Sequence, residues 1–93
     1  MKTFKDLEFK KHPNFGIGGF RTQAEMKFKN NYGVSVITGG YGNESQPYEV
    51  AVLYRDGLCY TTHITDDVIG YLTASEVTKI MKQVQELKES VNA

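Results

Sequence analysis

The sequence predicts an α+β fold, in which an antiparallel sheet of four to five strands carries one amphipathic C-terminal helix packed on one face. Three observations lead to this prediction. Apolar and polar residues alternate along residues 20–29, a pattern typical of a strand with one buried face. Strand-like segments are separated by short turn sequences rich in Asn, Asp and Gly. Apolar residues recur at helical spacing near the C-terminus, and a chain of 93 residues is expected to form a single domain, 1–93.

The strands are expected in the following order. Residues 20–29 (FRTQAEMKFK) are followed by Asn30-Asn31, which favours a tight turn because Asn tolerates positive φ, and residues 32–37 form the antiparallel partner. Residues 48–55 and 58–64 form a second hairpin around Asp56-Gly57, a frequent hairpin turn. A two-residue loop at that point would place Tyr54 opposite Cys59. Both faces of this hairpin are substantially apolar, which predicts a central place in the sheet or a second face that contacts a partner.

The helix is expected to begin after Thr73, because Thr73 and Glu76 have the spacing of a capping box. Leu72 and Val77 are placed for a hydrophobic staple around the cap. The apolar stripe that follows consists of Val77, Ile80, Met81, Val84, Leu87 and Val91.

Two further segments carry weaker patterns. Residues 65–72 (TDDVIGYL) are expected to form a short helical turn, with Asp66 and Asp67 at its positive end and Gly70 ending it. Residues 4–9 are expected to form an edge strand, and residues 12–19 a loop, because proline and glycine interrupt regular structure there.

The charge of the chain is balanced in total but uneven along the sequence. Eleven basic and eleven acidic residues cancel, which argues against a general polyanion-binding protein. Residues 1–29 contain seven basic and three acidic side chains, whereas residues 30–78 contain one basic and six acidic side chains. The acidic middle of the chain would suit a basic partner. Cys59 has no second cysteine to pair with, and no segment has the length of a signal peptide or membrane span, so a cytoplasmic location is favoured.

The glycine-rich stretch at residues 37–50 (ITGGYGNESQPYEV) raises the question of a phosphate-binding loop. Such loops use backbone N–H groups at a helix N-terminus, often with a nearby lysine. Here a strand is expected to follow, residues 30–54 contain no Lys or Arg, and Glu44 would repel a phosphate. The stretch is therefore interpreted as a strand connection that places Tyr41 at its tip and Tyr48 nearby, and exposed tyrosines are good contact residues.

The sequence contains no recognisable catalytic or metal-binding constellation. His63 and Cys59 would lie about 13 Å apart along one strand, too far to share a metal ion. Cys59 is expected to be a buried, unreactive thiol, and the adjacent carboxylates of Asp66 and Asp67 would diverge on a helix. We therefore expect a protein that is not an enzyme and uses no cofactor and no metal.

Three segments resemble a family of small, mostly uncharacterised phage and prophage proteins: NNYGVSVITGGYG, YEVAVLYRDGLCYTTHITDDVIGYLTASEV and IMKQVQEL. The resemblance covers roughly residues 30–87, and its most specific part is ITDDVIGYLT. It implies a non-structural phage protein that acts in the cytoplasm of the bacterial host. Small phage proteins without catalytic chemistry often bind and block a host protein, including defence nucleases such as CRISPR effectors.

The predicted function is therefore binding to a bacterial host protein that the chain inhibits or modulates, as an anti-CRISPR-like protein would. The predicted contact residues are Tyr41, Glu44, Tyr48, Asp56, Asp66 and Asp67. One alternative is a nucleic-acid-binding accessory protein that uses Lys10, Lys11, Arg21, Lys27 and Lys29, although these side chains also fit edge protection of a sheet. A second alternative is a self-associating structural module, such as a homodimer, formed through the second sheet face.

Overall fold

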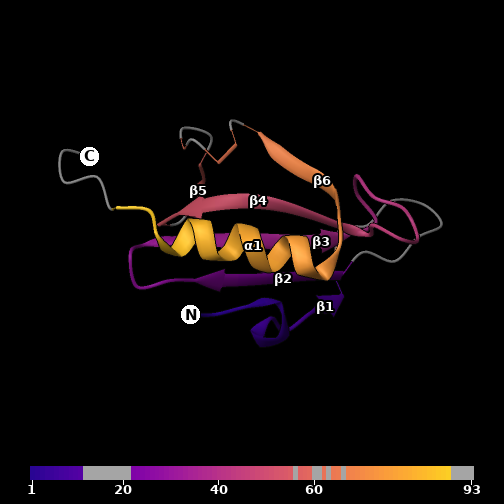
Figure 1. The fold of residues 1–93 in the computed structure, drawn as a ribbon, viewed down its shortest axis with the longest axis horizontal. Helices are drawn as coiled ribbons and strands as arrows, with labels where there is room; N and C mark the ends of the chain where they lie inside the picture. Colours follow the sequence, from indigo (N-terminus) through magenta and orange to yellow (C-terminus); the bar gives the residue numbers. More distant parts are fainter. Residues whose placement is uncertain (12–21, 56, 60–61, 63, 66, 89–93) are drawn as a thin grey trace.

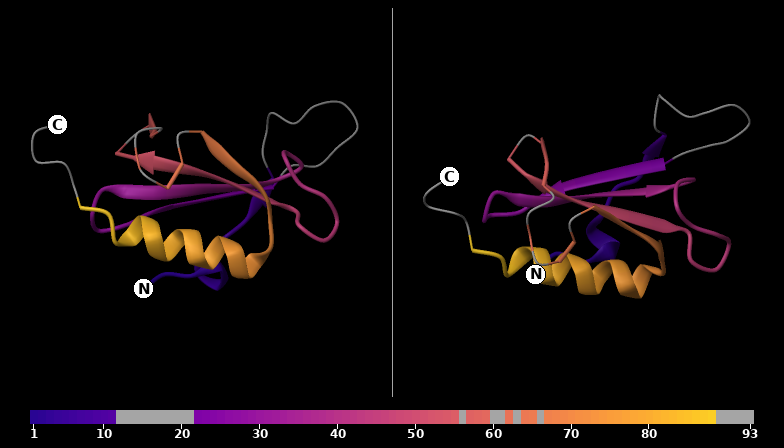
Figure 2. Two further views of the ribbon diagram at one scale, coloured as in Figure 1. Left: turned by 45° about the horizontal axis from the view of Figure 1, so that its top comes forward. Right: turned by 90° about the horizontal axis from the view of Figure 1, so that it is seen from above.

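A computed structural model of the chain describes residues 1–11, 22–55, 57–59, 62, 64–65 and 67–88. Within these residues, six strands form one antiparallel sheet and the helix α1 (Ala74–Gln85) lies across one face of it (Figure 1). Figure 2 shows the helix and the sheet as two layers seen from the side. The predicted α+β class is confirmed, with six strands in place of the expected four to five.

The strand β4 occupies the centre of the sheet. Its neighbour on one side is β3, while its other side pairs with β5 at one end and with β6 further along (Figure 1). On the far side of β3, the sheet continues through β2 to β1 at the edge. The strands are β1 (Lys10–Lys11), β2 (Thr22–Lys27), β3 (Tyr32–Thr38), β4 (Tyr48–Tyr54), β5 (Gly57–Leu58) and β6 (Val68–Leu72).

The hydrophobic core lies between α1 and the middle strands. Alternate residues of β2, β3 and β4 point toward the helix, and the alternation predicted for residues 20–29 is confirmed for Ala24, which is 1% exposed. Full burial of an aliphatic side chain contributes about 1.5–3 kcal/mol, so this packing, more than helix propensity, holds α1 in place. The core cluster comprises Val34, Val36, Val50, Val52, Leu72, Val77, Ile80, Met81 and Val84, with Leu87 packed against it.

The predicted start of α1 is confirmed. The hydroxyl oxygen of Thr73 accepts a hydrogen bond from the N–H of Glu76 at 3.2 Å, and the Glu76 carboxylate accepts one from the N–H of Thr73 at 2.9 Å. Leu72 and Val77, the two staple positions, are both buried in the core cluster. The capping box therefore satisfies N–H groups that a helix leaves without partners in its first turn.

The other end of α1 is capped by a side chain from a distant turn. The Asn30 side-chain amide donates to the carbonyl oxygens of Val84 and Leu87, each at 2.9 Å. Its amide oxygen accepts from the N–H of Tyr32, so the same side chain also shapes the β2–β3 turn. Asn31 in that turn has φ 69°, as its residue type predicted. The capping role of Asn30 was not predicted, because no sequence pattern relates it to the helix.

The N-terminal segment differs from its prediction. Residues 4–9 do not form an edge strand: Phe4–Asp6 form a turn of 3₁₀ helix, η1, and the edge strand β1 is the two residues that follow. The Asp6 carboxylate accepts from the N–H of Thr3 at 2.9 Å, which stabilises the turn. The Phe4 ring packs on Phe9 and Tyr48, so η1 is held against the core by aromatic contacts.

The expected helical turn before α1 is also wrong, because residues 68–72 form the strand β6. Val68 pairs with Ala51, and Ile69 pairs with Val50. Short apolar segments are ambiguous between helix and strand, and here the unpaired edge of β4 decides in favour of the strand.

The second hairpin is shorter than predicted and changes its register, because within the described residues the strand predicted at 58–64 is present only as β5 (Gly57–Leu58). Tyr54 lies opposite Gly57 instead of Cys59, so the register shifts by two residues and the turn is centred one residue earlier than predicted. Arg55, the residue after Tyr54, has φ 56°. A shift of two residues leaves the paired Leu53 and Leu58 on one face, as predicted, because side chains alternate with a period of two. Ile64, predicted on the same face, packs instead against the core cluster. The loop predicted at residues 12–19, the later part of the predicted strand at residues 60, 61 and 63, and Val91 lie outside the described residues.

Candidate protein-contact surface

The glycine-rich stretch connects β3 to β4, and the backbone N–H groups of Tyr41, Asn43, Ser45 and Gln46 in this connection donate to acceptors within the chain. The Asn43 side-chain oxygen accepts from the N–H groups of Ser45 at 3.1 Å and Gln46 at 2.8 Å. The Glu49 carboxylate accepts from the N–H of Tyr41 at 3.0 Å. These groups are therefore not arranged to hold an anion, in agreement with the interpretation of this stretch as a strand connection.

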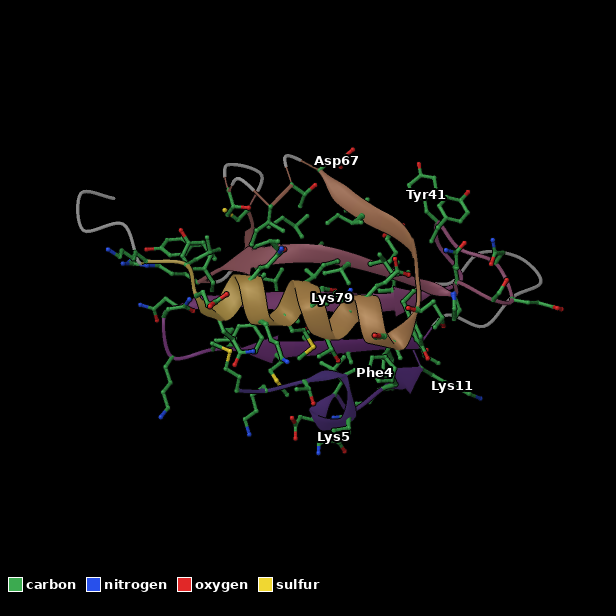
Figure 3. The ribbon with its side chains drawn as sticks, viewed as in Figure 1. Phe4, Lys5, Lys11, Tyr41, Asp67 and Lys79 are labelled. Atoms are coloured by element: carbon green, nitrogen blue, oxygen red, sulfur yellow. The ribbon has the colours of Figure 1, made fainter. Side chains whose placement is uncertain are left out.

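The tip of this connection lies against β6. The carbonyl oxygen of Tyr41 accepts a hydrogen bond from the N–H of Tyr71 at 2.9 Å. Gly70 makes the approach possible, because a Cβ atom at this position would lie 2.8 Å from the Tyr41 carbonyl oxygen and 2.5 Å from its Cβ. Both tyrosine side chains remain exposed, Tyr41 at 62% and Tyr71 at 52% (Figure 3 labels Tyr41).

Tyr71 has an unusual backbone conformation. The pairing of β4 with β6 shifts register between Tyr48 and Val50, so β6 has one residue more than β4 at this point. Tyr71 lies in this bulge with φ 57°, in the left-handed region that a bulky side chain rarely occupies. Bulges redirect side chains, and this one leaves a large aromatic ring in solvent at a backbone cost of about 1–3 kcal/mol.

Sequence analysis did not identify Tyr71 as a contact residue. The GYL sequence lies in a segment expected to be a helical turn, and the proximity of Tyr71 to Tyr41 depends on the pairing of β6 with β4. No local pattern reports that pairing. The available sequence feature was an aromatic residue next to a glycine.

Two predicted acidic contact residues lie within a few positions of the two tyrosines in the sequence. Glu44 is exposed in the same connection as Tyr41, and Asp67 is exposed immediately before β6. Figure 3 shows Tyr41 and Asp67 along the same edge of the sheet, near opposite ends of β6. We call Tyr41, Tyr71, Glu44 and Asp67 the tyrosine surface. Asp56 and Asp66 were also predicted as contacts and lie outside the described residues.

Tyr48 does not belong to this surface. Its ring is half-buried, with ring centroids 4.9 Å from Phe4 and 5.9 Å from Phe9. The side chain packs between the N-terminal segment and β4, which gives it a packing role, and its role as a partner contact stays a prediction.

The basic residues of the nucleic-acid alternative do not form one continuous group. Lys10 and Lys11 lie on β1 and border a small cavity together with Glu8 and Glu25. Lys27 and Lys29 border a different, larger cavity near the opposite end of β2. Arg21 lies outside the described residues.

The second face of the β4–β5 hairpin is covered in part by its own neighbours. Ala51 and Leu53 point away from α1, yet each is only 8% exposed. Leu58 on β5 is 55% exposed and is the larger apolar contribution there. The structure thus offers less apolar area for self-association at Ala51 and Leu53 than the sequence pattern indicated.

The acidic groups with shifted pKa values have structural roles. The N–H group of Thr73 lowers the pKa of Glu76 below 4.5, and the N–H group of Thr3 lowers the pKa of Asp6 below 3.8. Both carboxylates cap helical turns. Among the described residues, no three His, Cys, Asp or Glu side chains converge as metal ligands would, and Cys59 is half-buried where the sequence predicted burial.

Comparison with known proteins adds no relative to this description: no protein-family model, curated protein or solved structure matches the chain. Over the part of the chain that is described, no helix combines the length and the apolar character needed to cross a bilayer.

Proposed function

We propose that this chain acts by binding another protein through the tyrosine surface, and that the partner is a bacterial host protein with a basic contact face. The observation that carries the proposal is the pair of exposed tyrosines, Tyr41 and Tyr71, joined through their backbones. Tyrosine is enriched at protein interfaces, because its ring supplies a large contact area and a polar group while losing little conformational entropy.

The backbones that carry both rings are held in place before any partner arrives. Tyr41 donates its N–H to Glu49 and accepts from Tyr71, so both its peptide groups are fixed. The bulge in β6 holds Tyr71 by strand pairing on either side. A preorganised contact loses less entropy on binding than a mobile one. Retention of a strained backbone at an exposed aromatic residue is typical of functional sites.

The charge around the tyrosines favours a basic partner. Glu44 is exposed in the same connection as Tyr41, Asp67 is exposed immediately before β6, and residues 30–78 are strongly acidic overall. Charge complementarity accelerates association and selects among partners. The resemblance to phage proteins supports a host target, and the basic nucleic-acid-binding face of a defence nuclease fits the acidic surface. Binding there would inhibit the nuclease by occupying the face that its substrate needs.

The test is capture of partners from bacterial lysate with matched variants. The wild-type chain and a Leu58→Ser control, which alters an exposed apolar residue at the other end of β4, should retain the same protein. The double variant Tyr41→Ala/Tyr71→Gly should lose it while remaining folded by circular dichroism. The proposal is wrong if every captured protein is retained equally by the folded double variant, or lost equally by the control.

Increasing salt separates specific charge pairing from apolar contact. If Glu44 and Asp67 meet basic residues, the association rate should fall as salt is raised, and the Glu44→Gln/Asp67→Asn variant should show a weaker dependence. A salt dependence that is identical in wild type and variant would remove the acidic residues from the contact.

A further inference from the structure

A second surface, far from the tyrosine surface, concentrates positive charge around a cavity. The cavity has a volume of about 690 Å³ and opens between the N-terminal segment, the end of β2 and the last turn of α1. Its lining includes four lysines and one carboxylate. We call this cavity the basic groove; its lining includes Lys2, Lys5, Asp6, Lys27, Phe28, Lys29, Asn30 and Gln85.

One wall of the basic groove is anchored to α1 by hydrogen bonds. The N–H of Lys2 donates to the side-chain oxygen of Gln85, and the Gln85 side-chain amide donates to the carbonyl oxygen of Lys2, both at 2.8 Å. The N–H of Phe4 donates to the Thr78 hydroxyl at 3.1 Å. These bonds hold the segment that carries Lys2 and Lys5, and Figure 3 shows Lys5 on the side of the N-terminal segment that faces away from the sheet.

The other wall is anchored to the same helix. Lys27 and Lys29 flank Phe28 at the end of β2, and the next residue, Asn30, clamps the turn to the last carbonyl oxygens of α1. The N–H of Phe28 donates to the carbonyl oxygen of Tyr32 at 2.7 Å, which closes the turn. Both pairs of lysines are therefore positioned by the fold relative to one helix end.

Basic side chains outnumber acidic ones in the lining of the basic groove. The Asp6 carboxylate opposes the lysines, and it is already engaged by the N–H and hydroxyl of Thr3. The cavity near β1 provides an internal comparison, since two lysines and two glutamates border its 250 Å³ and balance each other. The lining of the basic groove contains four lysines and one carboxylate, so positive charge is in excess among its lining side chains.

We propose that the basic groove binds phosphate groups, either of a nucleotide or of a single-stranded nucleic acid. Its volume falls in the range of small-ligand sites, and its open shape also admits a strand. Lysine side chains bind phosphates as point charges, and the half-buried Phe28 ring offers an apolar surface for a base. This site differs from the nucleic-acid alternative drawn from sequence, because Lys2 and Lys5 replace Lys10 and Lys11.

Binding is tested with two probes, a fluorescently labelled short single-stranded DNA measured by anisotropy and ATP measured by calorimetry. The variant Lys2→Gln/Lys5→Gln/Lys27→Gln/Lys29→Gln should bind the recognised probe roughly tenfold more weakly or worse. The matched control is Lys10→Gln/Lys11→Gln/Lys79→Gln/Lys82→Gln, which removes the same charge outside the groove and should bind nearly as wild type. Circular dichroism establishes that both variants are folded.

The two probes separate the sources of phosphate. Binding of DNA without ATP supports a strand, and its affinity should fall with a log–log salt slope of about −3 if four phosphates are neutralised. Binding of ATP supports a nucleotide site. No binding of either probe at low salt overturns the proposal, and so does an equal loss in the control, because net charge alone would then explain it. None of these outcomes bears on the tyrosine surface, which the lysine variants leave intact.

Discussion

The backbone N–H of Tyr71 donates to the carbonyl oxygen of Tyr41 across 2.9 Å, and this bond joins the β3–β4 connection to the edge strand β6. The two residues are distant in sequence and belong to segments with no local relationship. Their rings are nevertheless among the largest apolar side chains left in solvent. The bond therefore converts two separate exposed aromatics into one fixed surface, which is the basis of the proposed protein contact.

The left-handed backbone of Tyr71 makes a prediction about stability. At φ 57°, glycine is unstrained whereas alanine is strained. The free energy of unfolding of Tyr71→Gly should therefore be about 1 kcal/mol higher than that of Tyr71→Ala. Tyr41 is not in the left-handed region, so Tyr41→Gly should have a lower free energy of unfolding than Tyr41→Ala. Glycine at this position only raises the conformational entropy of the unfolded chain. Urea unfolding of the four variants measures both differences. The same order at both positions would contradict the assigned backbone of Tyr71.

Gly70 is predicted to be required for the approach of the connection to β6. Gly70→Ala places a methyl group against the Tyr41 backbone and should lower the free energy of unfolding by about 1–3 kcal/mol. Gly57→Ala is the control, because no atom lies within 4 Å of the added carbon, and it should change stability by less than about 0.5 kcal/mol. Equal stability of the two variants would show that Tyr41 does not pack on β6.

The Asn30 cap predicts an effect of charge on the end of α1. Asn30→Ala removes donors to the Val84 and Leu87 carbonyl oxygens and should cost about 1–2 kcal/mol. Asn30→Asp should lower the free energy of unfolding further at neutral pH, because a carboxylate would face carbonyl oxygens at the negative end of the helix. Protonation at low pH should recover part of that difference. If Asn30→Asp proves as stable as wild type at neutral pH, the amide does not cap the helix.

The two capping carboxylates predict the direction of acid sensitivity. Backbone hydrogen bonds lower the folded-state pKa values of Glu76 and Asp6 below their ordinary values of 4.5 and 3.8. The stability they add is therefore complete above about pH 5 and is lost as pH falls through the lowered pKa values. Unfolding midpoints measured from about pH 7 to about pH 3 should decline. Glu76→Gln, which keeps an acceptor at this position, should flatten the decline, and an unchanged slope would remove Glu76 as its source.

The buried face of α1 predicts a contrast between two neighbouring helix positions. Met81 is 0% exposed in the core, so Met81→Ala should lower the free energy of unfolding by about 2–5 kcal/mol. Lys79 is exposed on the outer face of α1 (Figure 3), and Lys79→Ala should change it by less than about 0.5 kcal/mol. Thermal unfolding of the two variants tests which face of the helix contacts the sheet, and comparable losses would contradict the packing described.

Local patterns predicted the regular elements well where neighbours in sequence cause them. The alternation around Ala24 and the capping box of Thr73 and Glu76 both appear as expected. The apolar stripe of α1 is also buried at its first four positions. In each case the deciding contacts are made by residues a few positions apart, or by one face of a single element.

Within the described residues, the errors fall where a distant partner decides the structure. Residues 68–72 became β6 because β4 had hydrogen-bonding groups to satisfy along its edge. Residues 4–6 became a 3₁₀ turn because Phe4 packs on Phe9 and Tyr48. The hairpin register moved by two residues without changing the face of the paired Leu53 and Leu58, and a period of two leaves such a shift invisible in the sequence pattern.

The candidate surfaces divide in the same way. Sequence patterns were enough to predict the α+β class, the buried stripe of α1, the exposed Tyr41 and the acidic character of residues 30–78, because period and composition are properties of the chain alone. The tertiary structure alone decided that Tyr71 lies beside Tyr41, and that Lys2 and Lys5 border one cavity with Lys27 and Lys29. Those neighbours meet through strand pairing and through hydrogen bonds to α1, which join residues that no local period relates.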